Sequence, residues 1–266
     1  VFALDVTDPE SFGATKVLWE FRHADNDCVA VAAVGSDGGS TACREIGYGV
    51  TKPKIARMRD GTWVAVFGNG YNSFSQKAKL FVVDLKTGKL KYLLDAGTEG
   101  TAGTPNGLAA VETTDWPASD LNLSRAYAGD LRGKMWRFNF QTSPPTVATL
   151  FTATDAAGVV QPITARPSIA LNPDDITKAV VLFGTGSFFK VGDDSTVSPQ
   201  VQNMYGVFDA VTPVVGTTRS QLLAQTISSN AADVTLGGVT YPAGTLRFIT
   251  NNTLDSSKRG WLINLP

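Results

Sequence analysis

Apolar and polar residues alternate along this chain in short runs that are separated by glycine-containing turns. Between residues 53 and 97 the alternation predicts four strands, at 54–58, 63–67, 78–84 and 89–94. The intervening turns contain Asp60-Gly61, Asn69-Gly70 and Thr87-Gly88, and Asp-Gly or Asn-Gly between apolar alternations favours a tight turn. No stretch shows a long 3.6-residue apolar period, so we expect an all-β chain with little helix.

The same four-strand unit recurs further along the chain. A second unit is expected at 107–111, 125–128, 134–140 and 147–152, and a third at 163–171, 179–184, 204–209 and 222–227. The head, 1–5 and 17–21, has the pattern of the last two strands of another unit. The tail, 246–250 and 260–265, has the pattern of the start of one more.

Each unit also repeats a short phrase, in which the second strand ends in glycine and the third strand carries an aromatic residue. The glycine phrases are FGNG (67–70), AGD (128–130) and FGTG (183–186). A four-strand unit repeated at a spacing of roughly 45–60 residues is typical of a β-propeller, with long loop insertions here. A β-sandwich has similar strand counts and is the alternative. We expect residues 1–266 to form a single propeller domain or part of one that begins and ends within a blade.

Composition narrows the classes of partner. Lys and Arg number 23 and Asp and Glu number 24, so the formal charge is 23 − 24 = −1. Such a chain lacks the basic charge of a typical nucleic-acid or anionic-membrane binder. No apolar run approaches the roughly 18 residues of a membrane span, so no transmembrane segment is expected. The chain starts at Val1 without a signal-peptide pattern, which favours a fragment of a longer protein.

The two cysteines, Cys28 and Cys43, bracket a polar stretch rich in Gly, Ser and Asp. A disulfide closing this loop is expected to contribute about 3 kcal/mol and implies an oxidising compartment. The alternative is a pair of buried thiols.

The acidic segment 112–124 is the best candidate site in the sequence. Its side-chain oxygens come from Glu112, Asp115, Asp120 and Asn122, and a hard cation such as Ca²⁺ takes six to eight oxygens from a flexible loop. The spacing is not that of an EF-hand, and a solvated loop is the alternative. Trp116 in this segment is either an exposed binding anchor or folded back onto the body.

No arrangement of residues predicts catalysis, so we expect no enzyme. The one histidine, His23, lies between Arg22 and Asp25 in a polar segment, a setting typical of a solvated side chain. Nucleophile-elbow, P-loop and dinucleotide-binding patterns are missing. The tryptophans on expected strands are predicted to pack between blades; they are Trp19, Trp63, Trp136 and Trp261.

Several phrases in a fixed order resemble a known family. They are VFALDVTDP (1–9), VLWEF (17–21), FGNGYN (67–72), YAGDL (127–131), WRF (136–138), QPITARP (161–167), FGTG (183–186) and KRGW (258–261). Together they resemble the C-terminal β-propeller domain of the PilC/PilY family of type IV pilus-associated proteins. The resemblance covers nearly the whole chain.

This resemblance implies a modified, quinoprotein-like propeller from an exported protein of a Gram-negative bacterium, located at the pilus tip, outer membrane or cell surface. The implied function is a pilus biogenesis factor and tip adhesin that promotes pilus extension by opposing retraction and supports twitching motility and attachment. The implied partners are pilins or minor pilins and a host-cell or surface ligand.

The resemblance also bears on the acidic segment, because members of the family carry a pilus-regulating calcium site in an Asp-rich loop just before the YAGD phrase. That position is the segment from Glu112 to Ser124 here. Ser124 stands where the family pattern ends in Asp. Asp120 and Asn122 fall at positions where calcium ligands of the family pattern could be retained. Asp115, from a segment that is longer here than in the family, is the candidate to replace a missing ligand.

Two other functions stay open at this point. The DLKTG phrase at 84–88 is also common in quinone-dependent dehydrogenase propellers. A propeller that binds glycans or host proteins without a pilus role is the other alternative, since propeller loops present binding surfaces on a rigid scaffold.

Overall fold

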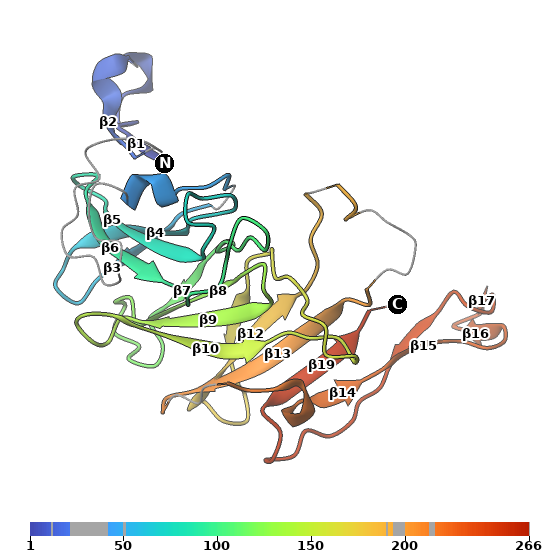
Figure 1. The fold of residues 1–266 in the computed structure, drawn as a ribbon. Coiled ribbons are helices and arrows are strands. Elements are labelled where there is room, and N and C mark those ends of the chain that lie inside the picture. Colours follow the sequence, from blue (N-terminus) through green and yellow to red (C-terminus); the bar gives the residue numbers. More distant parts are fainter. Residues whose placement is uncertain are drawn as a thin grey trace.

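The computed structural model describes residues 1–11, 13–21, 42–49, 52–189, 191–193, 200–212 and 216–265, and within them the protein is all-β (Figure 1). The helices in these residues are single 3-10 turns, at Pro9–Ser11, Ala14–Lys16, Ala42–Glu45 and Arg219–Gln221. None of the helical segments in the described part is long and apolar enough to span a membrane. The prediction of an all-β chain with little helix is confirmed.

The first complete sheet has the order β3-β4-β5-β6, with every neighbouring pair antiparallel. Its strands are β3 (Lys54–Arg57), β4 (Trp63–Gly68), β5 (Lys79–Asp84) and β6 (Leu90–Asp95). All four lie within a residue of the predicted positions. Asp60-Gly61 and Thr87-Gly88 lie in tight turns, as predicted. The predicted tight turn at Asn69-Gly70 is wrong, because Gly70 and Tyr71 instead bridge to Leu108 and Tyr48, and residues 69–78 connect β4 to β5.

The second sheet has the order β10-β9-β8-β7. Its strands are β7 (Glu112–Thr114), β8 (Arg125–Gly129), β9 (Lys134–Asn139) and β10 (Thr146–Thr152). The predicted first strand at 107–111 is wrong. Leu108 instead forms isolated bridges with Gly70 and Asp130, so this apolar segment crosses between two sheets and is buried there.

The third sheet has five strands in the order β11-β12-β13-β19-β14. They are β11 (Ser168–Leu171), β12 (Lys178–Gly184), β13 (Asn203–Ala210), β14 (Leu223–Gln225) and β19 (Gly260–Asn264). The prediction that 222–227 forms the fourth strand is wrong, because β19 takes that place and β14 pairs parallel to its outer edge. The ring of Trp261 on β19 covers Gly206 on β13, where a Cβ would lie 2.5 Å from the ring, so the match of a large and an absent side chain selects this partner.

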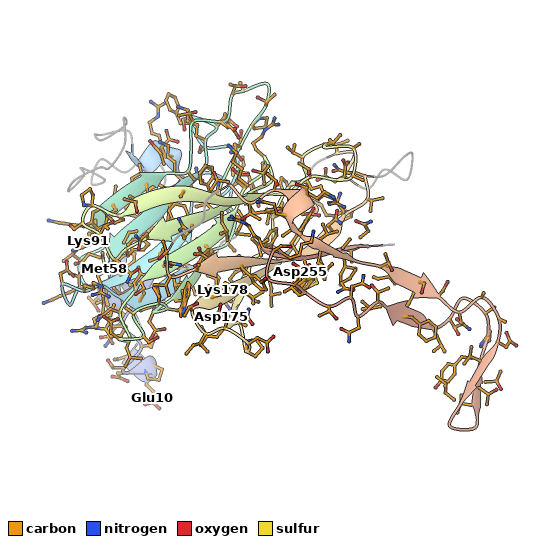
Figure 2. The ribbon with its side chains drawn as sticks, turned by 90° about the horizontal axis from the view of Figure 1, so that it is seen from below. Glu10, Met58, Lys91, Asp175, Lys178 and Asp255 are labelled. Atoms are coloured by element: carbon orange, nitrogen blue, oxygen red, sulfur yellow. The ribbon has the colours of Figure 1, made fainter. Side chains whose placement is uncertain are left out.

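Two smaller elements flank the three sheets. The N-terminal strands β1 (Phe2–Leu4) and β2 (Val17–Glu20) form an antiparallel pair, as predicted. Near the other end, β15 (Ile227–Ser229) pairs with β18 (Arg247–Ile249), and β16 (Val234–Leu236) pairs with β17 (Val239–Tyr241). These strands form a ribbon that projects away from the sheets (Figures 1 and 2). The tail segment at 246–250 therefore belongs to this ribbon and does not start a blade.

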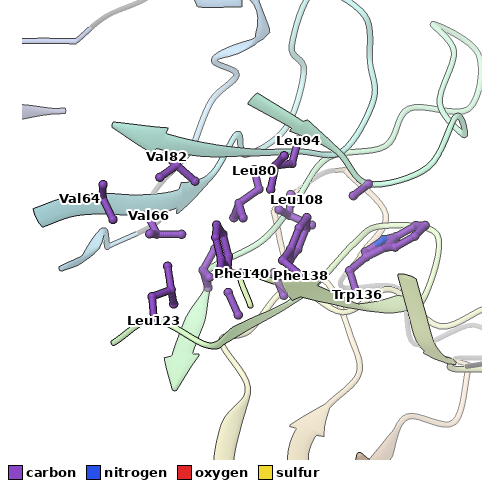
Figure 3. Close-up of a cluster of buried hydrophobic side chains, with 14 of the residues drawn as sticks. Val64, Val66, Leu80, Val82, Leu94, Leu108, Leu123, Trp136, Phe138 and Phe140 are labelled. Atoms are coloured by element: carbon purple, nitrogen blue, oxygen red, sulfur yellow. The ribbon is translucent and has the colours of Figure 1, made fainter. Parts of the chain in front are cut away.

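Among the described residues the hydrophobic core forms three clusters, one at each junction between neighbouring sheets. Since side chains alternate between the two faces of a strand, Leu80 and Val82 of β5 pack toward the second sheet and Phe81 packs toward the N-terminal pair. Figure 3 shows the first of these junctions, where side chains of β4 and β5 meet Phe138 and Trp136 of β9. The third cluster lies between the second and third sheets.

The first strands of the three sheets are neighbours, since β3 contacts β7 and β7 contacts β11. Antiparallel four-stranded units packed face to face, with their first strands together, are the blades of a propeller. We therefore refer to the three sheets as the first, second and third blades. Long side chains fill the junctions, and glycines mark the points where backbones cross.

A substitution at one crossing tests this packing. In Gly68→Ala the new Cβ would lie 2.2 Å from the carbonyl oxygen of Ala109, so we expect the free energy of unfolding to fall by about 1–3 kcal/mol. Gly103→Ala is the matched control, because nothing lies within 4 Å of its Cβ position, and it should change stability by less than about 0.5 kcal/mol. Urea unfolding of the purified variants measures both; equal midpoints would contradict the described crossing.

Candidate functional site

The acidic segment forms the connection from β7 to β8 and lies beside β3 of the first blade. The backbone N–H of Leu123 donates to the carbonyl oxygen of Arg57 at 2.7 Å, and that of Ser124 donates to the carbonyl oxygen of Thr114 at 2.9 Å. The returning half of the loop is thus tied both to its own strand and to the neighbouring blade. Ser119 and Leu121 have φ angles of 53° and 62°, so the chain turns sharply around Asp120.

Asp120 and Asn122 contact arginines of the first blade. Arg59 Nη2 lies 3.2 Å from Asp120 Oδ2, and Arg57 Nη1 donates to Asn122 Oδ1 at 3.0 Å. The hydrogen bond from the backbone N–H of Asn122 lowers the pKa of Asp120, and the charge of Arg59 lowers this pKa further. Asp120 is therefore a stable carboxylate with a guanidinium partner.

Glu112 and Asp115 lie elsewhere on the same connection. Glu112 is on β7, where its carboxylate lies 2.7 Å from Lys54 Nζ and 3.5 Å from Arg166 Nε. Asp115 Oδ2 accepts the Leu121 N–H at 3.3 Å. Both residues line a cleft of about 350 Å³ between β7 and β11, together with hydroxyls such as those of Ser119 and Ser168.

These four residues do not fit a calcium ion as the structure arranges them. Calcium needs six or more oxygens that converge on one point. Lys54 and Arg57, the partners of Glu112 and Asn122, are three residues apart on β3, about 10 Å along a strand. Across the described ranges, no three Asp, Glu, His or Cys side chains gather in a way that could hold a metal ion.

Trp116 is folded back onto the protein and is 5% exposed. Its ring packs on the guanidinium of Arg125, 4.6 Å from the ring centroid, and its Nε1 donates to the carbonyl oxygen of Ile176 at 3.3 Å. Of the two alternatives for Trp116, the structure shows the side chain folded back onto the body and not an exposed binding anchor. Trp136 is buried between blades as predicted, whereas Trp63 is 54% exposed, so the prediction that it packs between blades is wrong.

A buried charged cluster joins the second and third blades directly beneath Trp116. Asp209 on β13 accepts hydrogen bonds from Arg125 Nη1 at 2.7 Å, Arg137 Nη1 at 2.8 Å and the hydroxyl of Tyr127 at 2.7 Å. The side chains of Asp209 and Arg125 are 0% and 1% exposed. Burial raises the pKa of Tyr127, and the neighbouring Asp209 charge adds to the shift, so its hydroxyl stays a donor.

The sequence analysis missed this cluster. The available signal is that Arg125, Arg137 and Asp209 stand inside otherwise apolar strands, which is unusual for charged residues unless they are paired. Which charges pair depends on how the blades stack.

The disulfide prediction concerns residues that the structure does not place. Cys28 lies outside the described residues, as does the side chain of Cys43. The bond between them stays a prediction. His23 also lies outside the described residues.

Comparison with known proteins agrees with this architecture. The model of the family described as the PilY1 beta-propeller domain matches residues 1–238. A type IV pilus biogenesis factor PilY1 of Pseudomonas aeruginosa (strain PAO1) is 34% identical over 99% of this chain, and a PilY1 homolog of Xylella fastidiosa is 31% identical over 100% of it. The crystal structure of the P. aeruginosa PilY1 C-terminal domain superimposes with a TM-score of 0.78 at 31% identity, covering 100% of this chain and 56% of that one.

The fold and these comparisons thus define a β-propeller domain. The chain belongs to the PilY1 β-propeller family. It spans 22% of the length of the P. aeruginosa relative and 17% of the Xylella relative.

The buried cluster generates a stability prediction. Asp209→Ala leaves two buried guanidinium groups without their carboxylate, so we expect a loss of about 3–5 kcal/mol in the free energy of unfolding. Asp175→Ala is the control, because Asp175 pairs with Lys178 at the surface (Figure 2) and should cost about 1 kcal/mol or less. Calorimetric melting of both variants checks this; similar losses for the two would refute a special role of Asp209.

A second prediction concerns pH at the turn between β3 and β4. The hydrogen bond from Lys91, aided by the Thr62 amide, lowers the pKa of Asp60 from 3.8 to about 2. Because the folded-state pKa is depressed, the stabilisation by Asp60 is full above pH 3.8 and is lost as pH falls toward 2. Melting temperatures of wild type and Asp60→Asn should therefore converge between those values; a constant difference would contradict the assignment.

Proposed function

We propose that this chain is the propeller of a pilus biogenesis factor that promotes extension of the type IV pilus by opposing its retraction. The observation that carries the proposal is the 34% identity to a type IV pilus biogenesis factor over 99% of the chain. In this proposal the protein is exported by a Gram-negative bacterium, acts at the pilus tip or cell surface, and contacts pilins or minor pilins without catalysing a reaction. Adhesion to a host or other surface and support of twitching motility are part of the same proposal.

The interior of the propeller suits a protein that works under tension. Neighbouring blades share continuous apolar clusters, and the second and third blades are also joined by the buried Asp209 ion pairs. Separating these blades would expose apolar surface and strand buried charges at once. Such junctions resist separation when a retracting pilus or an attached surface pulls on the protein.

The DLKTG phrase, which motivated the alternative of a quinone-dependent dehydrogenase, has a structural explanation in this chain. Asp84 Oδ1 accepts the N–H groups of Lys86 and Thr87 and the hydroxyl of Thr87. Gly88 has a φ of 70° and lies under the ring of Trp19. The phrase is thus accounted for by a capped turn between β5 and β6, and it gives no support to a redox function.

Deletion of the gene in the source bacterium tests the proposal. We expect surface pili, counted by electron microscopy, to disappear and to return when the retraction motor is also disabled. Restoring the gene without the segment for residues 1–266 should fail to rescue piliation, whereas the intact gene should succeed. Immunoblots of exported protein serve as the control for expression. Unchanged pili in both backgrounds would refute a pilus role and would favour a binding propeller with another function.

A further inference from the structure

We propose that the side chains of Lys54, Arg57 and Arg59, here called the basic clamp, take the place of a bound cation and hold the loop 112–124 in its functional conformation without calcium. The clamp comes from β3 and the turn that follows it, in the first blade. The loop belongs to the second blade. The contact between them is therefore a junction of two blades, as well as a loop anchor.

The charges of the loop are balanced by basic side chains around it. The loop carries three carboxylates, those of Glu112, Asp115 and Asp120. Four cationic side chains are in reach of its oxygens: the three of the clamp, through the contacts at 2.7, 3.0 and 3.2 Å, and Arg166 at 3.5 Å from Glu112. The negative charge that would attract a divalent ion is already balanced. A calcium ion at Asp120 would have to displace the guanidinium of Arg59 and would be repelled by it.

The side-chain oxygens of Asp120 and Asn122 are already engaged by protein groups. Asn122 Oδ1, a neutral oxygen two residues after Asp120, accepts a hydrogen bond from Arg57. Asp120 Oδ1 accepts the Asn122 amide N–H at 3.1 Å while Oδ2 contacts Arg59. Each of these oxygens already has a donor or a cation.

The backbone of the loop around Asp120 is held in a conformation that few residues adopt. Ser119 and Leu121 both adopt left-handed backbone angles, which cost free energy in residues other than glycine and persist where the surroundings fix them. Within the loop, Asp115 accepts the N–H groups of both residues. From the first blade, the clamp and the Leu123–Arg57 backbone hydrogen bond hold Asp120 and the residues that follow it. A calcium-binding loop obtains the same constraint from its ion, so the clamp makes the ion unnecessary.

Calcium titration tests the first half of the proposal. Isothermal titration of the purified protein with Ca²⁺ up to about 2 mM, above the usual range of extracellular calcium modules, should show no saturable site that depends on Asp120. Saturable binding in wild type that disappears in Asp120→Asn would overturn the proposal.

Hydrogen exchange tests the second half. Amides of residues 119–123 should exchange at the same rate with calcium or with a chelator. In the double variant Arg57→Gln, Arg59→Gln they should exchange about fivefold faster, the factor that roughly 1 kcal/mol of lost pairing produces. Lys91→Gln is the matched control, because Lys91 pairs with Asp60 of the same turn, and we expect it to leave these amides unchanged.

Two results of the exchange experiment would contradict the proposal. Slower exchange of wild type on adding calcium, or unchanged exchange in the double variant, would overturn the clamp. If the double variant does not fold, as judged by circular dichroism, Arg59→Gln alone is compared with Lys91→Gln in the same way. Salt screens the attraction between exposed charges. If the clamp holds the loop, the exchange rates of residues 119–123 in the wild type should therefore also rise with ionic strength.

Discussion

Each blade of this protein is apolar on both faces, and this constraint governs the rest of the structure. β5 directs Leu80 and Val82 to one junction and Phe81 and Val83 to the other, so a single blade cannot be stable in water by itself. Stacking blades face to face is the arrangement that buries both surfaces. It leaves the first strands side by side and the connections between strands at the ends of the blades. The loop 112–124 is one of those connections, and its position beside β3 is a consequence of the stacking.

Polar groups that enter the junctions have to be satisfied there, and they make each junction specific. Asp209 meets Arg125, Arg137 and Tyr127 in a region without solvent, where an unpaired charge would be costly. Trp116 extends this cluster to the acidic loop by packing on Arg125. The loop is thus anchored to the third blade through Trp116 and to the first blade through the basic clamp. A segment held from both sides is a rigid feature of the surface, and its exposed residues, such as Leu121, are presented in a fixed geometry.

The carboxylates of an acidic loop in such a propeller can be neutralised in two ways. Carboxylates before the YAGD phrase can recruit a cation, or they can pair with basic residues of the adjacent blade. Either choice neutralises the loop and fixes its backbone, but only the first makes it respond to calcium. In this chain the contacts of Glu112, Asp120 and Asn122 with Lys54, Arg59 and Arg57 favour the second.

The strands of the first blade, the turn at Asp60-Gly61, the propeller class and the family could be predicted from the sequence, because they depend on local alternation, turn chemistry and ordered phrases. That β19, which begins fifty residues after β13 ends, completes the third blade could not be predicted. The segment 222–227 has the same local pattern, and the fit of Trp261 over Gly206 is a tertiary contact. The acidic segment was found from composition, but its chemistry was not. Whether a carboxylate meets an ion or an arginine depends on which side chains the neighbouring blade brings to it, and that is decided by the stacking of the blades.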